Sequence, residues 1–174
     1  MQEIKTERLT LKPMCREYLA TTHEYAGDLE NTRLMVFLPK ESEEETLAFI
    51  KDAEREFLKE KPEYYEMAVF RGERHIGGIS LWITDDETCE LGWTINKRFF
   101  GNGYAPEAAK AMIDYAADTL GIRHFIAQCD TENAPSQRVM EKLGMKLTAE
   151  YGGRINRASP DEERREYLYE LYIK

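Results

Sequence analysis

Hydrophobic and polar residues alternate in seven short stretches of the chain, as they do in β-strands with one buried face. In the clearest stretch, Cys89–Ile95, every second residue is apolar. Three of the stretches are separated only by the polar turns 71–74 and 84–87, which predicts an antiparallel meander. Gly77 and Gly78 lie inside one of them and predict a bulge or a close approach of the backbone. The seven predicted strands are residues 7–13, 65–69, 75–83, 89–95, 123–129, 145–151 and 167–173.

Apolar residues recur at helical spacing in three longer stretches, 42–61, 105–120 and 133–143. Their ends carry serine or asparagine caps, glycine stops or proline, and a weaker helical pattern covers 16–25. The apolar loop Leu34–Pro39 either covers a pocket or fills part of the core. A long polar loop separates the last two strands. The order of elements predicts a mixed sheet with helices, an α/β or α+β layered fold, and the length predicts a single domain over residues 1–174.

The stretch Phe99–Glu107 joins a predicted strand to a predicted helix. Free backbone N–H groups point outward at the start of a helix, and Gly101 and Gly103 would let an anion come close to them. Pro106 suits the first helical turn, and the Glu107 carboxylate suits the positive end of the helix dipole. The stretch therefore predicts a phosphate site. A tight turn that merely needs glycine conformations is the alternative interpretation.

Composition and charge narrow the possible partners. The formal net charge of −9 argues against nucleic acid and is compatible with a cationic substrate. No apolar run is long enough to span a bilayer, and the first seven residues lack the layout of a signal peptide. We therefore expect no membrane partner and a cytoplasmic location. The three cysteines and three histidines are scattered without metal-ligand spacing, so we expect no metal site.

Two short motifs lie on the elements that follow the predicted meander. Residues 100–105 match the pattern Arg/Gln-x-x-Gly-x-Gly/Ala except at their first position, and Asn133 and Ser136 match Asn-x-x-Ser on the helix after the next strand. With these motifs in this order, the chain resembles the GNAT superfamily of N-acetyltransferases over essentially its whole length. Residues 6–9 and 99–108 most resemble the branch that holds the ribosomal-protein N-terminal acetyltransferases.

Two residues depart from the family pattern. Phe100 stands where many members carry Arg or Gln, which removes a side-chain contact to the pyrophosphate but leaves the backbone amides. Met140 stands where some members carry a tyrosine general acid, so another group must serve or none is needed.

The resemblance implies a mixed, mostly antiparallel sheet of about seven strands with helices on both faces. It implies an acetyl-CoA-dependent N-acetyltransferase that moves an acetyl group to a primary amine by direct attack in a ternary complex. The acceptor would be a peptide N-terminus or a small-molecule amine. The sequence does not fix the oligomeric state, and a homodimer is the commonest default.

The resemblance also implies roles for individual residues. Glu90 is the candidate general base, acting through a water, because an ammonium group with a pKa near 10 must lose a proton before it attacks. Ser136 is the candidate group that hydrogen-bonds or protonates the leaving sulfur. The implied donor-binding residues are Trp93, Thr94 and Ile95, through their backbone groups; Phe100, Gly101, Asn102, Gly103, Tyr104 and Ala105 in the turn; and Asn133 and Ser136 on the helix.

Each role has a structural alternative. The alternative for Glu90 is an ordinary solvent-facing strand residue. The alternative for Asn133 and Ser136 is that they cap their own helix. Arg154 and Arg157 either meet an acidic group of the acceptor or are solvated loop charges. Covalent catalysis through Cys129 lacks a nearby histidine in the sequence.

Two other function classes compete with the enzyme. One is a non-catalytic acyl-CoA-binding module on the same scaffold. The other is a nucleotide-binding enzyme, for which Asp130 would be the acidic residue at a strand end. Two features argue against this class. No Walker A triplet is present, and Pro106 stands where a dinucleotide fingerprint needs its third glycine.

Overall fold

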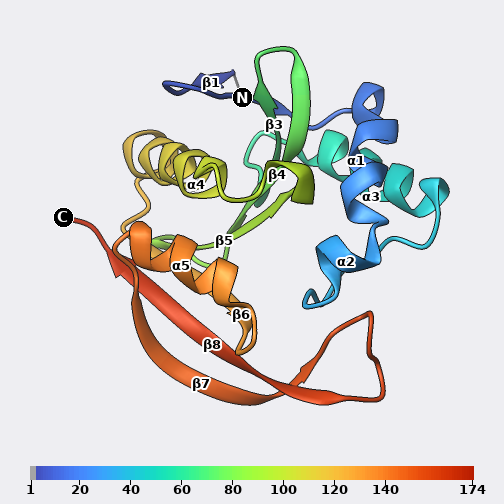
Figure 1. Cartoon of the computed structure of the whole chain (residues 1–174). Coiled ribbons are helices and arrows are strands. Elements are labelled where there is room, and N and C mark those ends of the chain that lie inside the picture. The colour runs from blue at the N-terminus through green and yellow to red at the C-terminus, as the bar shows by residue number, and fades with distance from the viewer. Residues whose placement is uncertain (1–2) are drawn as a thin grey trace.

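The computed structural model describes residues 3–174, so Met1 and Gln2, the start of the segment inspected for a signal peptide, lie outside the described residues. Within this range, eight strands form one sheet in the order β1-β2-β3-β4-β5-β6-β8-β7 (Figure 1). Neighbouring strands are antiparallel except β5 and β6, which are parallel. The strands are β1 (Ile4–Lys5), β2 (Thr10–Pro13), β3 (Tyr64–Arg71), β4 (Arg74–Ile83), β5 (Thr88–Ile95), β6 (His124–Asp130), β7 (Lys146–Ile155) and β8 (Glu163–Tyr172).

Helices cover both faces of this sheet. Figure 1 shows α1, α2 and α3 on the opposite side of the sheet from α4 and α5. The predicted mixed, mostly antiparallel sheet with helices on both faces is thus confirmed; the strand beyond the expected seven is β1, whose two residues are too short to show alternation. The helices are α1 (Leu19–Ala26), α2 (Leu29–Thr32), α3 (Glu43–Glu56), α4 (Tyr104–Tyr115) and α5 (Ala134–Lys142). In the described part of the chain, no helix combines the length and hydropathy needed to cross a bilayer.

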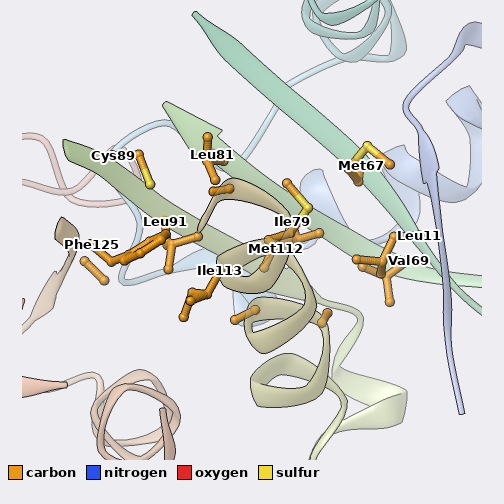
Figure 2. Close-up of a cluster of buried hydrophobic side chains, with 14 of the residues drawn as sticks. Leu11, Met67, Val69, Ile79, Leu81, Cys89, Leu91, Met112, Ile113 and Phe125 are labelled. Atoms are coloured by element: carbon orange, nitrogen blue, oxygen red, sulfur yellow. The ribbon is translucent and has the colours of Figure 1, made fainter. Parts of the chain in front are cut away.

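The larger hydrophobic core lies between α4 and the sheet (Figure 2). Met112 and Ile113 of α4 pack there against apolar residues that alternate along β3, β4 and β5. A smaller core on the other face joins α3 to β3 through Ile50, Ala53 and Ala68. The alternation read from the sequence therefore identifies which strand residues face α4.

Gly77 is the close-approach point that the sequence predicts. A Cβ atom at this position would lie 2.3 Å from the carbonyl oxygen of Thr94 on β5. The pairing of β3 with β4 also shifts register between Val69 and Phe70, next to this glycine. Only a residue without a side chain lets β4 and β5 approach this closely.

The last hairpin differs from the prediction. The polar segment expected as a long loop is mostly strand, because β7 continues to Ile155 and β8 begins at Glu163. A register shift between Tyr151 and Arg154 contains Gly152 and Gly153, so these glycines form a bulge inside the hairpin and not its end. β8 lies next to β6, which leaves β7 at the edge of the sheet.

Candidate active site

The sheet opens between its two parallel strands. β5 pairs with β6 only through Thr88, Cys89 and Glu90. β5 then continues to Ile95, and β6 continues to Asp130, without further pairing to each other in residues 3–174. The second half of β5 therefore presents an edge inside the sheet, where an extended ligand can hydrogen-bond to the backbone.

A cleft of about 430 Å³ lies along this edge. It is bounded by α2 and the apolar loop, the second half of β5, the turn before α4, and α5 along its length. The predicted donor-binding residues that line it are Trp93, Thr94, Ile95, Phe100, Gly101, Gly103, Tyr104, Ala105, Asn133 and Ser136. The structure thus brings together residues from four separate segments of the chain.

The glycine turn (residues 99–105) begins α4. Gly101 and Gly103 have φ angles of 78° and 76°, in the left-handed region that favours glycine, and Gly103 is the N-cap of α4. Asn102 is the one predicted turn residue that does not line the cleft. Its side chain donates hydrogen bonds to the carbonyl oxygens of Phe99 and Phe100 and so holds the turn in shape.

Arg8 supports the turn from outside the predicted site. Its guanidinium donates to the carbonyl oxygen of Asn102 at 3.0 Å and to the Glu107 carboxylate at 2.7 Å. Burial opposes ionisation of Glu107, but its bonds with Thr6 and Arg8 outweigh burial and hold the pKa of Glu107 below its usual value. The Glu107 carboxylate predicted to interact with the helix dipole is therefore also an anchor for the N-terminal segment.

The second half of β5 offers fewer backbone groups than the sequence suggests. Backbone groups alternate in direction along a strand. The carbonyl oxygen of Thr94 points towards β4, as its closeness to Gly77 shows, so Thr94 lines the cleft with its side chain. The carbonyl oxygen of Ile95 already accepts a hydrogen bond from Asn31 Nδ2 at 3.1 Å. Trp93 is thus the residue of the three whose backbone best matches the expected role.

Asn133 caps α5, as its alternative interpretation predicts. Its Oδ1 accepts a hydrogen bond from the Ser136 N–H at 3.2 Å. Since Asn133 supplies the cap, the hydroxyl of Ser136 is not needed for that purpose. Ser136 lines the cleft opposite the second half of β5.

Glu90 belongs to the last residue pair before β5 and β6 separate, and it is half-buried. It does not line the cleft itself. Burial, and then the Glu166 carboxylate, raise the pKa of Glu90, whereas Arg154 acts in the opposite direction. A carboxyl group with a raised pKa at the apex of the opening has the chemistry of a general base, and it is not the freely solvated residue of the alternative interpretation.

Arg154 and Arg157 both form ion pairs within the protein. The side chain of Arg154 is only 8% exposed and pairs with Glu166 at 2.8 Å. It also donates to the carbonyl oxygen of Leu34 at 3.0 Å. Arg157 pairs with Glu45 at 2.6 Å. The loop interpretation is wrong for Arg154, because the longer hairpin places this residue within β7. Arg157 does lie in the loop between β7 and β8, with 30% of its side chain exposed.

The apolar loop Leu34–Pro39 borders the cleft, which agrees with the first of its two predicted alternatives. Leu34 and Met35 line the cleft, and the Arg157 N–H donates to the carbonyl oxygen of Met35 at 3.0 Å. Phe37 is 71% exposed, so the loop is not a core plug. The loop is one wall of the cleft, and the β7–β8 hairpin holds it in place.

Sequence reasoning missed a buried carboxyl group on β3, on the same side of the sheet as Glu90. Glu66 is 4% exposed, and its Oε2 accepts hydrogen bonds from the hydroxyls of Tyr64 and, at 2.5 Å, Ser80. Burial raises the pKa of Glu66 to about 7, although the hydrogen bonds from Ser80 and Tyr64 oppose this. The sequence feature that could have identified Glu66 is a glutamate within a predicted strand of otherwise apolar residues.

We expect Glu66→Gln to flatten the pH dependence of stability. Between about pH 4.5 and pH 7 the folded protein keeps a proton on Glu66 that the unfolded chain has lost, so the free energy of unfolding falls as pH rises through this range. Urea unfolding at pH 5 and pH 8 should show the wild type losing about 2–3 kcal/mol more than the variant. The exposed substitution Glu60→Gln should behave like the wild type. Parallel pH profiles for Glu66→Gln and wild type would contradict the expected ionisation.

The structure does not favour covalent catalysis through Cys129. Burial raises the pKa of the Cys129 thiol to about 11, which disfavours the thiolate that nucleophilic catalysis requires. Among residues 3–174, no group of three or more His, Cys, Asp and Glu side chains is placed to hold a metal ion.

The geometry matches a family of acyl-transferring enzymes. A family model described as "Acetyltransferase (GNAT) domain" matches residues 8–146. The chain therefore belongs to the GNAT acetyltransferases, as the sequence resemblance predicts.

Individual relatives agree with this assignment. The chain is 29% identical over 147 residues to the uncharacterized N-acetyltransferase YnaD of Bacillus subtilis, which covers 82% of each chain. A GNAT-family acetyltransferase structure from Bacillus anthracis is 28% identical, covers 98% of each chain and has a TM-score of 0.83. The structure of RimL, a ribosomal L7/L12 alpha-N-protein acetyltransferase in complex with coenzyme A, has a TM-score of 0.84 over 98% of each chain. At 17% identity, it shows a shared fold.

Proposed function

We propose that this protein transfers the acetyl group of acetyl-CoA to a primary amine by direct attack in a ternary complex. One observation carries the proposal: the unpaired half of β5, the glycine turn and the start of α5 surround a single cleft. A cleft that joins a strand edge to a helix N-terminus suits a ligand with both amide groups and phosphates.

The residues present suit the donor. The backbone N–H groups at the start of α4 would hold the pyrophosphate, because Gly101 and Gly103 leave the approach to them free of side chains. Trp93 would pair with the pantetheine amides as a neighbouring strand does. A backbone N–H of β5 would face the oxygen that becomes negative during transfer.

Glu90 and Ser136 would handle the protons. Glu90, through a water, takes a proton from the acceptor ammonium, so that the amine nitrogen can form a bond with the acetyl carbon. The carbon–sulfur bond then breaks, and Ser136 stabilises or protonates the departing thiolate. The attacking nitrogen loses its second proton as the amide forms, and this proton replaces the one that the thiolate takes from Ser136. The products are the N-acetylated amine, coenzyme A and the first proton, which Glu90 releases to solvent.

The acceptor in this proposal is a peptide N-terminus or a small-molecule amine. The printed name of RimL describes an alpha-N-protein acetyltransferase, which favours the peptide class by analogy. The predicted likeness to the ribosomal-protein branch supports the same class. The open end of the sheet, beside Glu90, is where such an amine would enter.

Acetyl-CoA should raise the melting temperature. A ligand at a hundred times its Kd adds about 2.7 kcal/mol to the free energy of unfolding, which for a domain of this size corresponds to roughly 5–11 °C. Thermal unfolding with acetyl-CoA should show this rise, whereas NAD and ATP should not. A folded protein whose Tm does not change with acetyl-CoA would exclude the proposed donor.

Two glycines give a matched test of where the donor binds. Gly101 and Gly121 have φ angles of 78° and 76°, and a Cβ at either position would meet no atom within 4 Å. Valine at either site should therefore cost a similar amount of stability, about 1–2 kcal/mol. Gly101→Val should lose the acetyl-CoA response, and Gly121→Val, which lies outside the cleft, should keep it.

A further inference from the structure

A row of side chains crosses the sheet on the face away from α4. Trp82 of β4 pairs with Tyr64 of β3 on one side and with Glu90 of β5 on the other. Glu90 in turn pairs with Ile126 of β6. Directly paired residues share a face and have neighbouring Cβ atoms. The exposed ring of Trp82 is therefore the immediate cross-strand neighbour of the candidate base.

The ring of Trp82 is held in position from two sides. It stacks on the ring of Tyr64, with centroids 4.9 Å apart and an interplanar angle of 23°. A Cβ atom added to Gly92 would lie only 3.1 Å from Cζ3 of this ring. The ring therefore extends along the backbone of Gly92, towards the opening of the sheet. Glu66 fixes Tyr64 by accepting a hydrogen bond from its hydroxyl. Yet 36% of Trp82 remains exposed, which leaves a rigid aromatic surface beside Glu90.

The charges around this surface favour one kind of ligand. The Glu166 carboxylate is close enough to Glu90 to raise the pKa of Glu90. The arginines at this end of the sheet, Arg154 and Arg157, are already paired with Glu166 and with Glu45. A cation is therefore attracted beside Trp82, whereas a carboxylate placed there meets like charge. Aromatic faces also attract ammonium groups and stack with flat rings.

We propose, on the basis of the proposed N-acetyltransferase activity, that Trp82 selects the acceptor. Its exposed ring takes the aromatic or other apolar body of a primary amine whose nitrogen reaches Glu90 through one water. An amine with a carboxylate on the same carbon is rejected. The acceptor class is thus an amine or an N-terminus with an aromatic or apolar side group, and not a free amino acid.

The kinetic test compares phenethylamine, phenylalanine and ethylamine as acceptors. Wild type should have a kcat/KM for phenethylamine at least tenfold above those for the other two. Trp82→Ala should lower the phenethylamine value about tenfold, mainly through KM, and leave the values for ethylamine and for acetyl-CoA within twofold. Trp82→Phe should restore most of the loss.

The matched control is Tyr172→Ala, which removes an aromatic residue from another part of the surface. Tyr172 is 70% exposed, and its replacement should change none of these values. Equal losses for phenethylamine and ethylamine in Trp82→Ala would overturn the proposal.

A binding test separates this proposal from the proposed function. The chain has two tryptophans, so in Trp93→Phe the fluorescence comes from Trp82 alone. Phenethylamine should quench it in a saturable way, and phenylalanine should not. If this pattern appears and the wild-type protein transfers no acetyl group to either amine, the selection by Trp82 stands and the proposed activity fails. The proposal that Trp82 selects the acceptor is wrong if neither amine changes the fluorescence, or if both change it equally. This conclusion holds whether or not the protein is an active enzyme.

Discussion

Replacing Glu90 with glutamine should slow acetyl transfer by about 100-fold with little change in the KM for acetyl-CoA. General bases contribute 10²–10⁴-fold to rates, and we take the lower end because Glu90 would act through a water. Glutamine has the shape of glutamate but cannot accept the proton. Release of coenzyme A under saturating donor, with a fixed amine, measures the effect. The exposed substitution Glu73→Gln, in the turn between β3 and β4, should leave the rate unchanged.

The pH profile gives the same hypothesis a second, independent readout. Because the pKa of Glu90 is raised by burial and by Glu166, the rate should fall on the acid side at a pH above the ordinary value of a glutamate. This acid limb should disappear in Glu90→Gln. A decrease smaller than tenfold, with the acid limb intact, would assign the proton transfer to another group. An acetyl-CoA-binding protein with no activity towards any amine would favour the non-catalytic alternative.

Replacing Asp130 with alanine should destabilise the protein by about 3–5 kcal/mol, because it removes the buried carboxylate that pairs with Arg164 and leaves the buried Asn156 amide without its acceptor. Asp130 is 0% exposed and accepts hydrogen bonds from Arg164 at 2.5 Å and from Asn156 at 2.6 Å. Burial opposes its ionisation, but these bonds and one from the Glu132 N–H outweigh burial and hold the pKa of Asp130 below its usual value. A fall in Tm of roughly 6–20 °C is expected for a domain of this size.

The controls for Asp130 test charge and location separately. Asp130→Asn keeps part of the hydrogen bonding but not the charge, so its loss should be smaller. Asp86→Ala removes an exposed aspartate and should leave the Tm nearly unchanged. Because the native pKa is lowered, the advantage of wild type over Asp130→Ala should shrink as the pH falls below about 4. A Tm loss no larger than that of Asp86→Ala would show that the network around Asp130 does not stabilise the fold.

Local patterns were sufficient for much of the fold. Alternation along β3, β4 and β5 identified the face that packs on α4, because a strand buried on one side has a strict period of two. Capping chemistry located α5, since Asn133 satisfies an N–H in the first turn. Positive φ angles at Gly101 and Gly103 agree with the predicted turn, since few other residues adopt them.

Long-range contacts could not be predicted in this way. The Asn31 side chain donates a hydrogen bond to the carbonyl oxygen of Ile95, and Arg154 donates one to the carbonyl oxygen of Leu34. The two residues of each pair are far apart in the chain, so no local sequence pattern predicts their contact. The double glycine at 152–153 was misleading because a bulge and a loop have the same local composition. The stacking of Trp82 on Tyr64 depends on strand register, which only the folded sheet defines.

The hydrogen bonds from Arg154 and from the Arg157 backbone join the apolar loop to the last hairpin, which constrains how this wall of the cleft can be redesigned. Leu34 and Met35 lie more than a hundred residues before their donors, yet the two segments form one wall. Grafting a loop from another family member at 33–40 alone would misplace the carbonyl groups that these donors reach. It would leave Nη2 of the nearly buried Arg154 guanidinium without the acceptor that Leu34 provides. The segments 33–40 and 154–157 are therefore one exchangeable module, and a chimera should inherit both from the same parent.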